Sequence, residues 1–202
     1  MTIYCIGRNY AEHARELNNP VPTEPIIFSK PATAVLRENK AFYLPDFSQN
    51  VHYEVEVLLK VGKPGRRISE DKAMDHISHI GLGIDFTARD LQDRCKAKGH
   101  PWEIAKAFDH SAVIGDWIPR EELPAGSIRF SLQKNKQTVQ QGDTADLIFP
   151  FERLISVISG YFTLMQGDII FTGTPEGVGQ VHEGDLLEGY IGDRRIFWTE
   201  VR

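Results

Sequence analysis

The chain of 202 residues is predicted to be an α+β protein with a substantially antiparallel or mixed sheet. Short segments rich in β-forming residues are scattered along it, and helical patterns interrupt them at irregular intervals. The last two strand candidates are separated by Gly192-Asp193, a pair typical of a tight turn in an antiparallel hairpin. A regular alternation of strand and helix, which would indicate a parallel sheet, does not occur.

The strand candidates are enriched in branched and aromatic side chains, and turn residues border them. In chain order they cover residues 26–28, 53–61, 80–86, 128–133, 168–171, 185–190 and 196–201. The segment 168–171 runs directly into a loop rich in glycine, which extends from Gly173 to Gly179.

Three helices are expected, over residues 10–17, 88–98 and 151–159. For the second, Thr87 can serve as the N-cap and Gly99 follows the last turn. The third begins after Pro150 and has helical apolar periodicity that indicates a role in packing only. Its apolar residues are Phe151, Leu154, Ile155 and Ile158.

Length and composition indicate one globular domain, residues 1–202, large enough to bury a core. The net charge is −5 and basic residues are not clustered, which argues against nucleic acid as the partner. Cys5 and Cys95 form no disulfide framework or metal-binding spacing. Neither a signal peptide nor an apolar run long enough to span a membrane is visible, so we expect a cytoplasmic protein.

Glu54 and Glu56 are two residues apart in a strand candidate, so their carboxylates project from the same face. Burying two such charges without a partner costs several kcal/mol, and Mg²⁺ or Mn²⁺ between them would remove that cost. Asp85, at the end of the 80–86 strand, is the best candidate for a third oxygen ligand. Two alternatives stay open: a half-exposed edge strand with solvated carboxylates, and an Asp85 that only caps the following helix.

His13 and Glu16 are three residues apart on the first predicted helix and therefore share a face. A carboxylate that fixes one imidazole nitrogen raises the basicity of the other, which suits a general base for water. Lys106 lies in a small apolar run, where a lysine could neutralise charge on a reacting oxygen. The simpler alternatives are an incidental surface pair and a lysine that extends to solvent.

The glycine-rich loop lacks the ending of a phosphate-binding P-loop and the spacing of a dinucleotide fingerprint, so we reject nucleotide binding. Its backbone N–H groups and the Thr174 hydroxyl could instead bind a substrate carboxylate. As an isolated feature it could also be an ordinary turn.

Taken together, these segments resemble the fumarylacetoacetate hydrolase family, in particular its short branch of acylpyruvases and oxaloacetate decarboxylases or tautomerases. The resemblance covers nearly the whole chain, and its markers occur in family order. They are Gly7-Arg8-Asn9-Tyr10, His13 with Glu16, Ser29-Lys30-Pro31, Glu54-x-Glu56, Asp85, Thr87-Ala88-Arg89-Asp90, Gln92, Lys106, Gly173-Thr174-Pro175 and Gly177-Val178-Gly179.

The resemblance implies a mixed β-sandwich roll of the C-terminal-domain type with a few short helices, assembled as a homodimer. It implies that Mg²⁺ or Mn²⁺ is bound by Glu54, Glu56 and Asp85. The implied catalytic residues are His13, Glu16 and Lys106, and the implied substrate-binding residues are Arg8, Arg89, Gln92, Thr174 and Pro175. The helix that carries His13 would order over bound ligand as a lid.

The larger hydrolases of the family supply a further carboxylate ligand, which has no match in residues 5–10 of this sequence. The SH3-like domain that precedes the catalytic domain in those hydrolases is not seen either. Both differences argue against fumarylacetoacetate as the substrate. We therefore expect hydrolysis of the C–C bond of 3-acylpyruvates (2,4-dioxo acids) to pyruvate and a carboxylic acid, with oxaloacetate decarboxylation or tautomerisation as a second activity. All three reactions pass through the same kind of enolate. The alternatives are an isomerase or decarboxylase of 2-hydroxy-2,4-diene-dioates in aromatic catabolism, and a protein that binds metal without catalysis.

Overall fold

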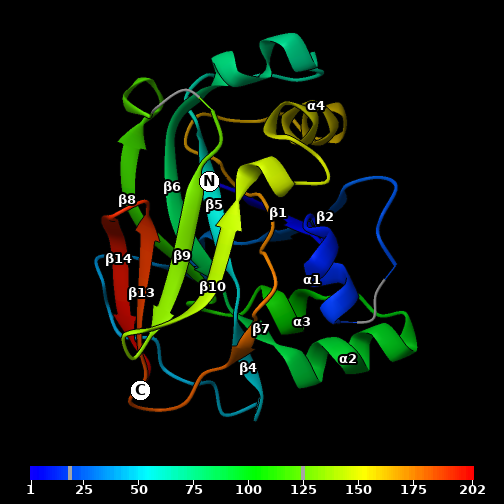
Figure 1. Ribbon diagram of the computed structural model, residues 1–202. Coiled ribbons are helices and arrows are strands. Elements are labelled where there is room, and N and C mark those ends of the chain that lie inside the picture. Colours follow the sequence, from blue (N-terminus) through cyan, green and yellow to red (C-terminus); the bar gives the residue numbers. More distant parts are fainter. Residues whose placement is uncertain (18–19, 124–125) are drawn as a thin grey trace.

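The computed structural model describes residues 1–17, 20–123 and 126–202, and its largest element is a curved mixed sheet of seven strands (Figure 1). The strands are β1 (Ile3–Gly7), β2 (Ile26–Lys30), β3 (Val35–Leu36), β4 (Val51–Tyr53), β5 (Val55–Val61), β6 (Ile77–Asp85), β7 (Thr87–Ala88), β8 (Ala112–Pro119), β9 (Arg129–Lys134), β10 (Gln137–Asp143), β11 (Ile169–Phe171), β12 (Gly179–Gln180), β13 (Leu186–Ile191) and β14 (Arg194–Glu200). The α-helices are α1 (Ala11–Glu16), α2 (Arg89–Lys98), α3 (Glu103–Lys106) and α4 (Phe151–Tyr161), and short 3₁₀ helices cover Ala32–Ala34, Glu70–His76, Arg120–Glu122 and Thr144–Asp146.

The large sheet has the strand order β2-β1-β11-β5-β6-β8-β3, with β1 parallel to β11, β3 parallel to β8 and the other pairs antiparallel. A second, antiparallel sheet has the order β10-β9-β13-β14, and a small third sheet has the order β12-β4-β7. The fold is therefore α+β with a mixed sheet, as predicted, and the expected hairpin turn at Gly192-Asp193 joins β13 to β14.

Apolar side chains pack on both faces of the large sheet. The larger core contains Val55, Val57 and Leu59 of β5 together with residues of β9, β13, β14 and α4, so it lies between the large sheet, the second sheet and α4. A smaller cluster contains Leu58 with Cys5 and Phe171. Since side chains alternate along a strand, Glu56 projects from the same face as Leu58.

The helix α2 begins one residue later than expected and is capped differently. Its N-cap is Ala88, with no side-chain cap, so the predicted capping role of Thr87 is wrong. The Thr87 hydroxyl instead donates to the backbone oxygen of Asp85 (3.3 Å), because Thr87 still lies in a strand. Gly99 adopts the left-handed conformation at the C-cap, as its position predicted.

The sequence prediction missed whole strands. Those absent from the prediction are β1, β3, β7, β8, β10 and β12, and the short helix α3 was also missed. The predicted strand 53–61 is interrupted at Glu54, which separates β4 from β5.

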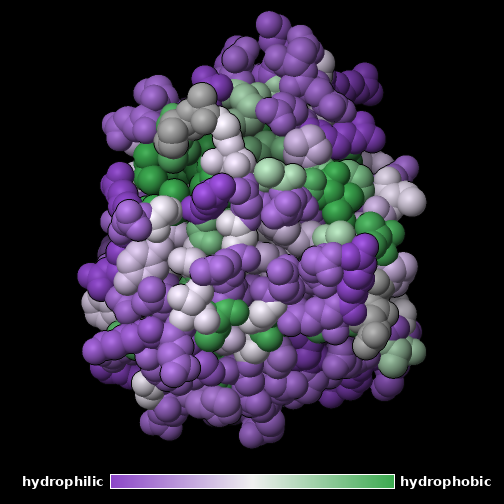
Figure 2. All heavy atoms as spheres, viewed as in Figure 1, coloured by the Kyte–Doolittle hydropathy of each residue, from purple (hydrophilic) through white to green (hydrophobic). Residues whose placement is uncertain are grey.

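Polar side chains cover most of the surface seen in Figure 2, and hydrophobic ones gather in patches over its upper half. Among the described helices, none combines the length and apolar character needed to cross a bilayer.

Candidate active site

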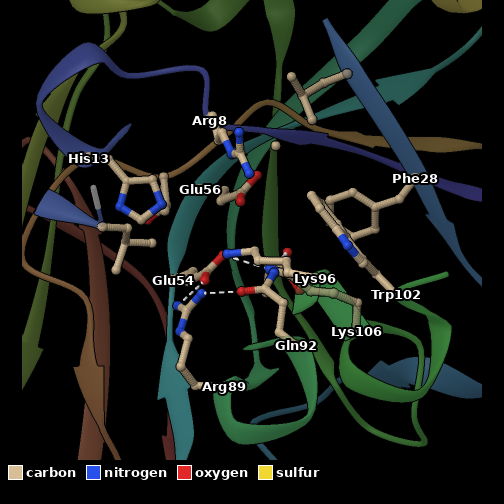
Figure 3. Close-up of a pocket in the computed structure, with 15 residues that line it drawn as sticks. Arg8, His13, Phe28, Glu54, Glu56, Arg89, Gln92, Lys96, Trp102 and Lys106 are labelled. Atoms are coloured by element: carbon tan, nitrogen blue, oxygen red, sulfur yellow. Dashed lines mark hydrogen bonds and ion pairs between the residues drawn. The ribbon is translucent and has the colours of Figure 1, made fainter. Parts of the chain in front are cut away.

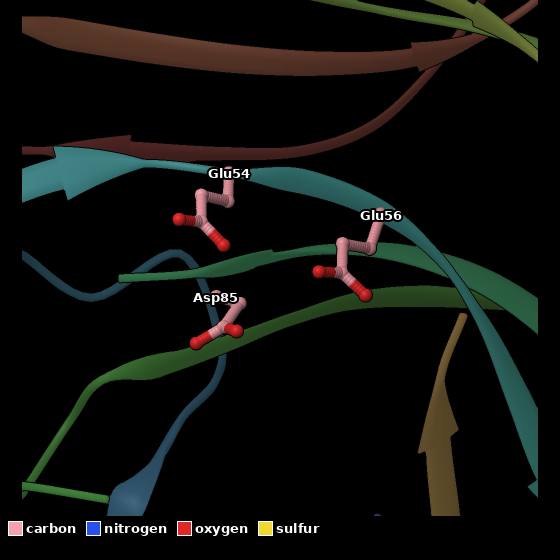
Figure 4. A group of neighbouring side chains, drawn as sticks. All are labelled: Glu54, Glu56 and Asp85. Carbon is pink, nitrogen blue, oxygen red and sulfur yellow. The ribbon is translucent and has the colours of Figure 1, made fainter. Parts of the chain in front are cut away.

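Three buried carboxylates converge at the adjoining ends of β5 and β6. Glu54 immediately precedes β5, Glu56 lies within it, and Asp85 is the last residue of β6. Their ligand atoms all lie within 4.8 Å of one another, and the three groups face a common space (Figure 4). Because β5 lies between β11 and β6 and all three side chains are buried, the alternative of a solvated edge strand is wrong.

Three buried cations surround two of these carboxylates. Lys106 Nζ lies 2.7 Å from both Glu54 Oε2 and Asp85 Oδ2, while Arg89 Nη2 lies 2.5 Å from Glu54 Oε1. Lys30 Nζ forms an ion pair with Asp85 Oδ1 at 2.7 Å. The Asp85 carboxylate is therefore held by two lysines, and the alternative that it only caps α2 is wrong because no side chain caps that helix. Lys106 is only 3% exposed and does not extend to solvent.

These contacts shift the pKa values of Glu54 and Glu56 in opposite directions. Burial alone would raise the pKa of Glu54, but Lys106 and Arg89 hold it below its usual value. Burial raises the pKa of Glu56 well above normal, and Asp85 and Glu54 raise it further. No ion pair is formed by Glu56 among the described residues, and its Oε2 accepts a hydrogen bond from the Gly173 N–H (2.6 Å).

The cluster is suitable for a divalent cation because Glu56 has no ionic partner among the described residues. The donor set consists of oxygen atoms only, which hard ions such as Mg²⁺ and Mn²⁺ prefer. Each carboxylate has about four lone-pair sites, so Glu54 and Asp85 can bind an ion beside their lysine and arginine partners. These three residues fit the predicted metal site.

His13 reaches the same pocket from α1, on the left of the view in Figure 3. Its Nδ1 lies 3.4 Å from Glu16 Oε2, and its side chain is buried, so the alternative of an incidental surface pair does not describe it. Burial lowers the pKa of His13, although Glu54 and Glu16 oppose that effect. A neutral imidazole with Nδ1 directed to Glu16 leaves Nε2 to accept a proton.

The glycine-rich loop is linked to both parts of the site. Its Gly173 N–H donates to Glu56, and its Gly177 N–H donates to the Glu16 carboxylate (3.1 and 3.2 Å). These two N–H groups are thus used by protein carboxylates, not left for a substrate. Gly173 has φ +105°, and a Cβ there would meet Asn9 Cβ at 2.6 Å, so the turn requires glycine.

Thr174 and Pro175 follow in this loop, and the buried Gln140 of β10 holds both. Gln140 Nε2 lies 2.9 Å from Thr174 Oγ1 and from the Pro175 carbonyl oxygen, while its Oε1 accepts from the Val55 N–H (3.0 Å). Since Thr174 Oγ1 accepts from Gln140, its own proton can be donated into the pocket.

The remaining pocket walls come from α2 and from aromatic residues. Arg89 Nη1 donates to Gln92 Oε1 (2.7 Å), which fixes both side chains. Phe28 and Trp102 pack edge to face, with centroids 6.0 Å apart, on the side opposite His13 in Figure 3. The pocket also contains Arg8 and Lys96, together with Ile6, Gly7, Leu17, Glu54, Glu56, Asp85, Lys106 and Thr174.

The structure thus brings the predicted site residues to one place: Glu16 lies within hydrogen-bonding distance of the pocket-lining His13, and Pro175 directly follows the pocket-lining Thr174 and is held with it by Gln140. Sequence reasoning assigned no role to Lys30, Lys96, Trp102 or Gln140. Lys30 stood within a recognised motif, and Lys96 shares a helical face with Arg89 and Gln92, so both carried a usable signal.

Comparison with known proteins supports the sequence resemblance. Residues 2–197 match the family described as fumarylacetoacetate (FAA) hydrolase C-terminal. The mitochondrial oxaloacetate tautomerase of Homo sapiens is 42% identical over 190 residues, covering 94% of this chain and 86% of that protein.

Two solved structures are also similar. Fumarylpyruvate hydrolase from Pseudomonas aeruginosa, in complex with Mn²⁺ and pyruvate, has a TM-score of 0.94 and 39% identity, covering 100% of this chain and 89% of that one. A 5-carboxymethyl-2-hydroxymuconate delta-isomerase from Mycobacterium smegmatis has a TM-score of 0.88 and 32% identity, covering 99% and 78%. The match over nearly the whole sequence, with the fold and these relatives, shows that the chain belongs to the fumarylacetoacetate hydrolase family.

Proposed function

We propose that this chain is a divalent-metal-dependent enzyme that enolises 2-oxo acids at C3, with two reactions: hydrolysis of the C–C bond of 3-acylpyruvates and tautomerisation of oxaloacetate. The observation that carries the proposal is the buried cluster of Glu54, Glu56 and Asp85, in which Glu56 lacks an ionic partner. A bound Mg²⁺ or Mn²⁺ would supply Lewis-acid polarisation of the substrate's keto oxygen.

The charge of the site suits an anionic substrate. The three carboxylates are offset by Lys30, Lys106 and Arg89, so a dication leaves two formal positive charges. A 2-oxo acid that becomes an enolate gains the complementary negative charge as it reacts. Burial lowers the pKa of Lys106, but Asp85 and Glu54 raise it above its usual value, so its ammonium remains charged beside the reacting oxygens.

Hydrolysis is favoured as one of the two reactions by the pair of His13, which is buried, and Glu16, which is partly exposed. Only hydrolysis needs an activated water, which attacks the distal carbonyl so that the C3–C4 bond breaks and pyruvate and a carboxylic acid leave. Tautomerisation needs only relocation of a proton, and the human relative named an oxaloacetate tautomerase supports it. Because one similar structure is a 5-carboxymethyl-2-hydroxymuconate delta-isomerase, 2-hydroxy-2,4-diene-dioates are an alternative substrate class for this chain.

The test is His13→Ala, assayed with acetylpyruvate and with keto and enol oxaloacetate in Mg²⁺, in Mn²⁺ and in chelator. Removal of a general base typically costs about 10²–10⁴-fold, so hydrolysis should fall by that factor while tautomerisation changes much less. His182→Ala, at an exposed histidine, is the matched control. Equal loss of both reactions would show that His13 is not specific to hydrolysis. If the unmodified protein shows no turnover that chelator removes, a metal-binding protein without catalytic activity is favoured.

Three further expectations from the sequence remain predictions and form part of this proposal: one domain over residues 1–202, a homodimer, and a cytoplasmic location. A lid movement of α1 belongs with them. The hydrogen bond from the Gly177 N–H to Glu16 is a contact that would have to break for α1 to move away from the glycine-rich loop.

A further inference from the structure

The strand β10, at the edge of the second sheet, carries one buried polar side chain next to the active site. Among residues 137–143 only Gln140 is buried, with 2% of its surface exposed. The pairing of β10 with β9 shifts register between Thr138 and Gln140, so Val139 is an extra residue in the strand. Such β-bulges redirect neighbouring side chains and often occur beside active sites. Beside this bulge Gln140 points inward, whereas Gln141 is exposed.

Gln140 connects two segments that separate where β11 ends. The strand β11 pairs with β5 as far as Phe171, and the chain then leaves the sheet in the glycine-rich loop. Nearer the start of β5, Gln140 Oε1 accepts from the Val55 N–H (3.0 Å), and Gln140 Nε2 donates to the Pro175 carbonyl oxygen (2.9 Å). In Figure 1 the loop, drawn in orange, passes beside β10. The side-chain amide therefore takes the place of a backbone peptide group between β5 and the loop.

The loop also lies in close contact with the bulge. A Cβ on Gly177 would meet Val139 O at 2.4 Å and Gln140 Cγ at 3.4 Å, so glycine is needed for the loop to approach this closely. Gly177 has φ +93°, which favours glycine as well. The position of Gln140 against the loop is thus fixed by packing as well as by hydrogen bonds.

The two backbone contacts determine which way the Gln140 amide faces. An N–H group can only donate and a carbonyl oxygen can only accept, so Oε1 faces Val55 and Nε2 faces Pro175. The second hydrogen of Nε2 is then available to Thr174 Oγ1, which lies 2.9 Å away. The Thr174 hydroxyl accepts from Gln140, and among the described residues it donates to no other group. Because Thr174 lines the pocket, its hydrogen is left for an acceptor there.

We infer that Gln140 is a positioning residue that makes the Thr174 hydroxyl a hydrogen-bond donor to the substrate's carboxylate. The inference rests on the proposed function, in which the substrate is a 2-oxo acid, and adds a residue of β10 to the groups that bind it. Gln140 is not among the residues that line the pocket, so it acts through Thr174. A carboxylate can only accept hydrogen bonds, so it needs a hydroxyl whose hydrogen is not used by the protein.

The test is a double-mutant cycle that combines Gln140→Glu with Thr174→Val in the Mn²⁺-loaded protein, with enol oxaloacetate as substrate. The introduced carboxylate can still accept from the Val55 N–H but has no hydrogen to donate, so the Thr174 hydroxyl turns toward it and away from the substrate. Loss of a hydrogen bond to a charged group weakens binding by about 10- to 100-fold. With Thr174 present, KM should therefore rise by about that factor beyond any rise in the Thr174→Val protein, while kcat changes by less than about 3-fold.

Two further variants guard this test. Repulsion between the new carboxylate and the substrate would act in both backgrounds, so only the difference between them reports an effect that passes through the hydroxyl. Gln141→Glu, at the exposed neighbour on the same strand, is the matched control and should leave KM unchanged. If Gln140→Glu does not fold, Gln140→Met removes both Nε2 bonds without adding charge. Its KM should rise by about 3- to 10-fold, and Thr174→Val should abolish this rise.

An effect of the Gln140 variants that is the same in both backgrounds, or that falls on kcat alone, would overturn the inference while leaving the proposed function intact. If the unmodified protein turned over neither oxaloacetate nor acetylpyruvate, the proposed function would fail. Calorimetric binding of pyruvate to the Mn²⁺-loaded proteins would then measure the same cycle. A coupling of about 10-fold or more between the two positions supports the inference, and additive effects or no binding contradict it.

Discussion

Glu56→Gln should show that the Glu56 carboxylate does not stabilise the metal-free protein but is needed to bind the metal ion. The substitution keeps an oxygen that can accept from the Gly173 N–H but removes the charge. Without metal, the variant should be at least as stable as the unmodified protein. In the presence of Mn²⁺, it should lose the stabilisation that the ion provides.

The magnitudes follow from the geometry. Ligand atoms no more than 4.8 Å apart repel by at least about 3.5 kcal/mol per ionised pair at an effective dielectric constant of about 20. Ionised Glu56 has two such neighbours, and they add to burial, which is the larger cause of the raised pKa of Glu56. Removing this carboxyl therefore costs the metal-free protein no favourable ion pair.

Metal binding adds stability by mass action. At about 100 times Kd, a ligand that binds only the folded state contributes about 2.7 kcal/mol, which corresponds to roughly 5–10 °C in Tm for a chain of this size. Thermal unfolding with and without Mn²⁺ measures this shift. Glu122→Gln, at an exposed glutamate, is the charge-matched control and should keep the full shift.

Two outcomes would contradict this role of Glu56. A Glu56→Gln protein that gains the same Tm shift with Mn²⁺ would show that the ion binds elsewhere. A metal-free variant several degrees less stable than the unmodified protein would show that the Glu56 carboxylate is stabilising in the absence of an ion.

Two further predictions concern charge. Lys30→Met removes one of the buried cations beside Asp85 and should lower the free energy of unfolding by about 3–5 kcal/mol, as measured by urea denaturation. A loss below about 1 kcal/mol would contradict a stabilising role of the Lys30–Asp85 ion pair. Because the folded pKa of Glu56 is raised, its protonated form stabilises the metal-free protein at low pH, and this contribution is lost as pH rises through that pKa. The affinity for Mn²⁺ should therefore rise with pH over the same range by calorimetry, and a flat profile would contradict this assignment.

The sequence predicted the residues of the site better than the strands that carry them. The alternation around Glu54 and Glu56 and the ordered motifs identified most of the polar residues that line the pocket, but not Lys96. The strand β10 was missed because its residues, Gln137–Asp143, are largely polar and give no apolar alternation. For the same reason Gln140, which anchors Thr174, could not be distinguished from its neighbours.

Contacts between residues far apart in the sequence were also not predicted. Lys30 and Asp85 come from strands that are not neighbours in the sheet, and no local spacing relates them. Thr87 had the residue type and position of an N-cap, but the chain remains extended there because β7 pairs with β4. In each case a tertiary contact decided the outcome.

Anomalous diffraction from a crystal soaked in Mn²⁺ would show whether Glu54, Glu56 and Asp85 hold one divalent cation, as proposed here. We expect a single strong anomalous peak among the three carboxylates, within about 2.0–2.3 Å of an oxygen of each, with no equivalent peak in a Glu56→Gln crystal. The absence of a peak there, with the carboxylates still held only by lysine and arginine, would contradict it.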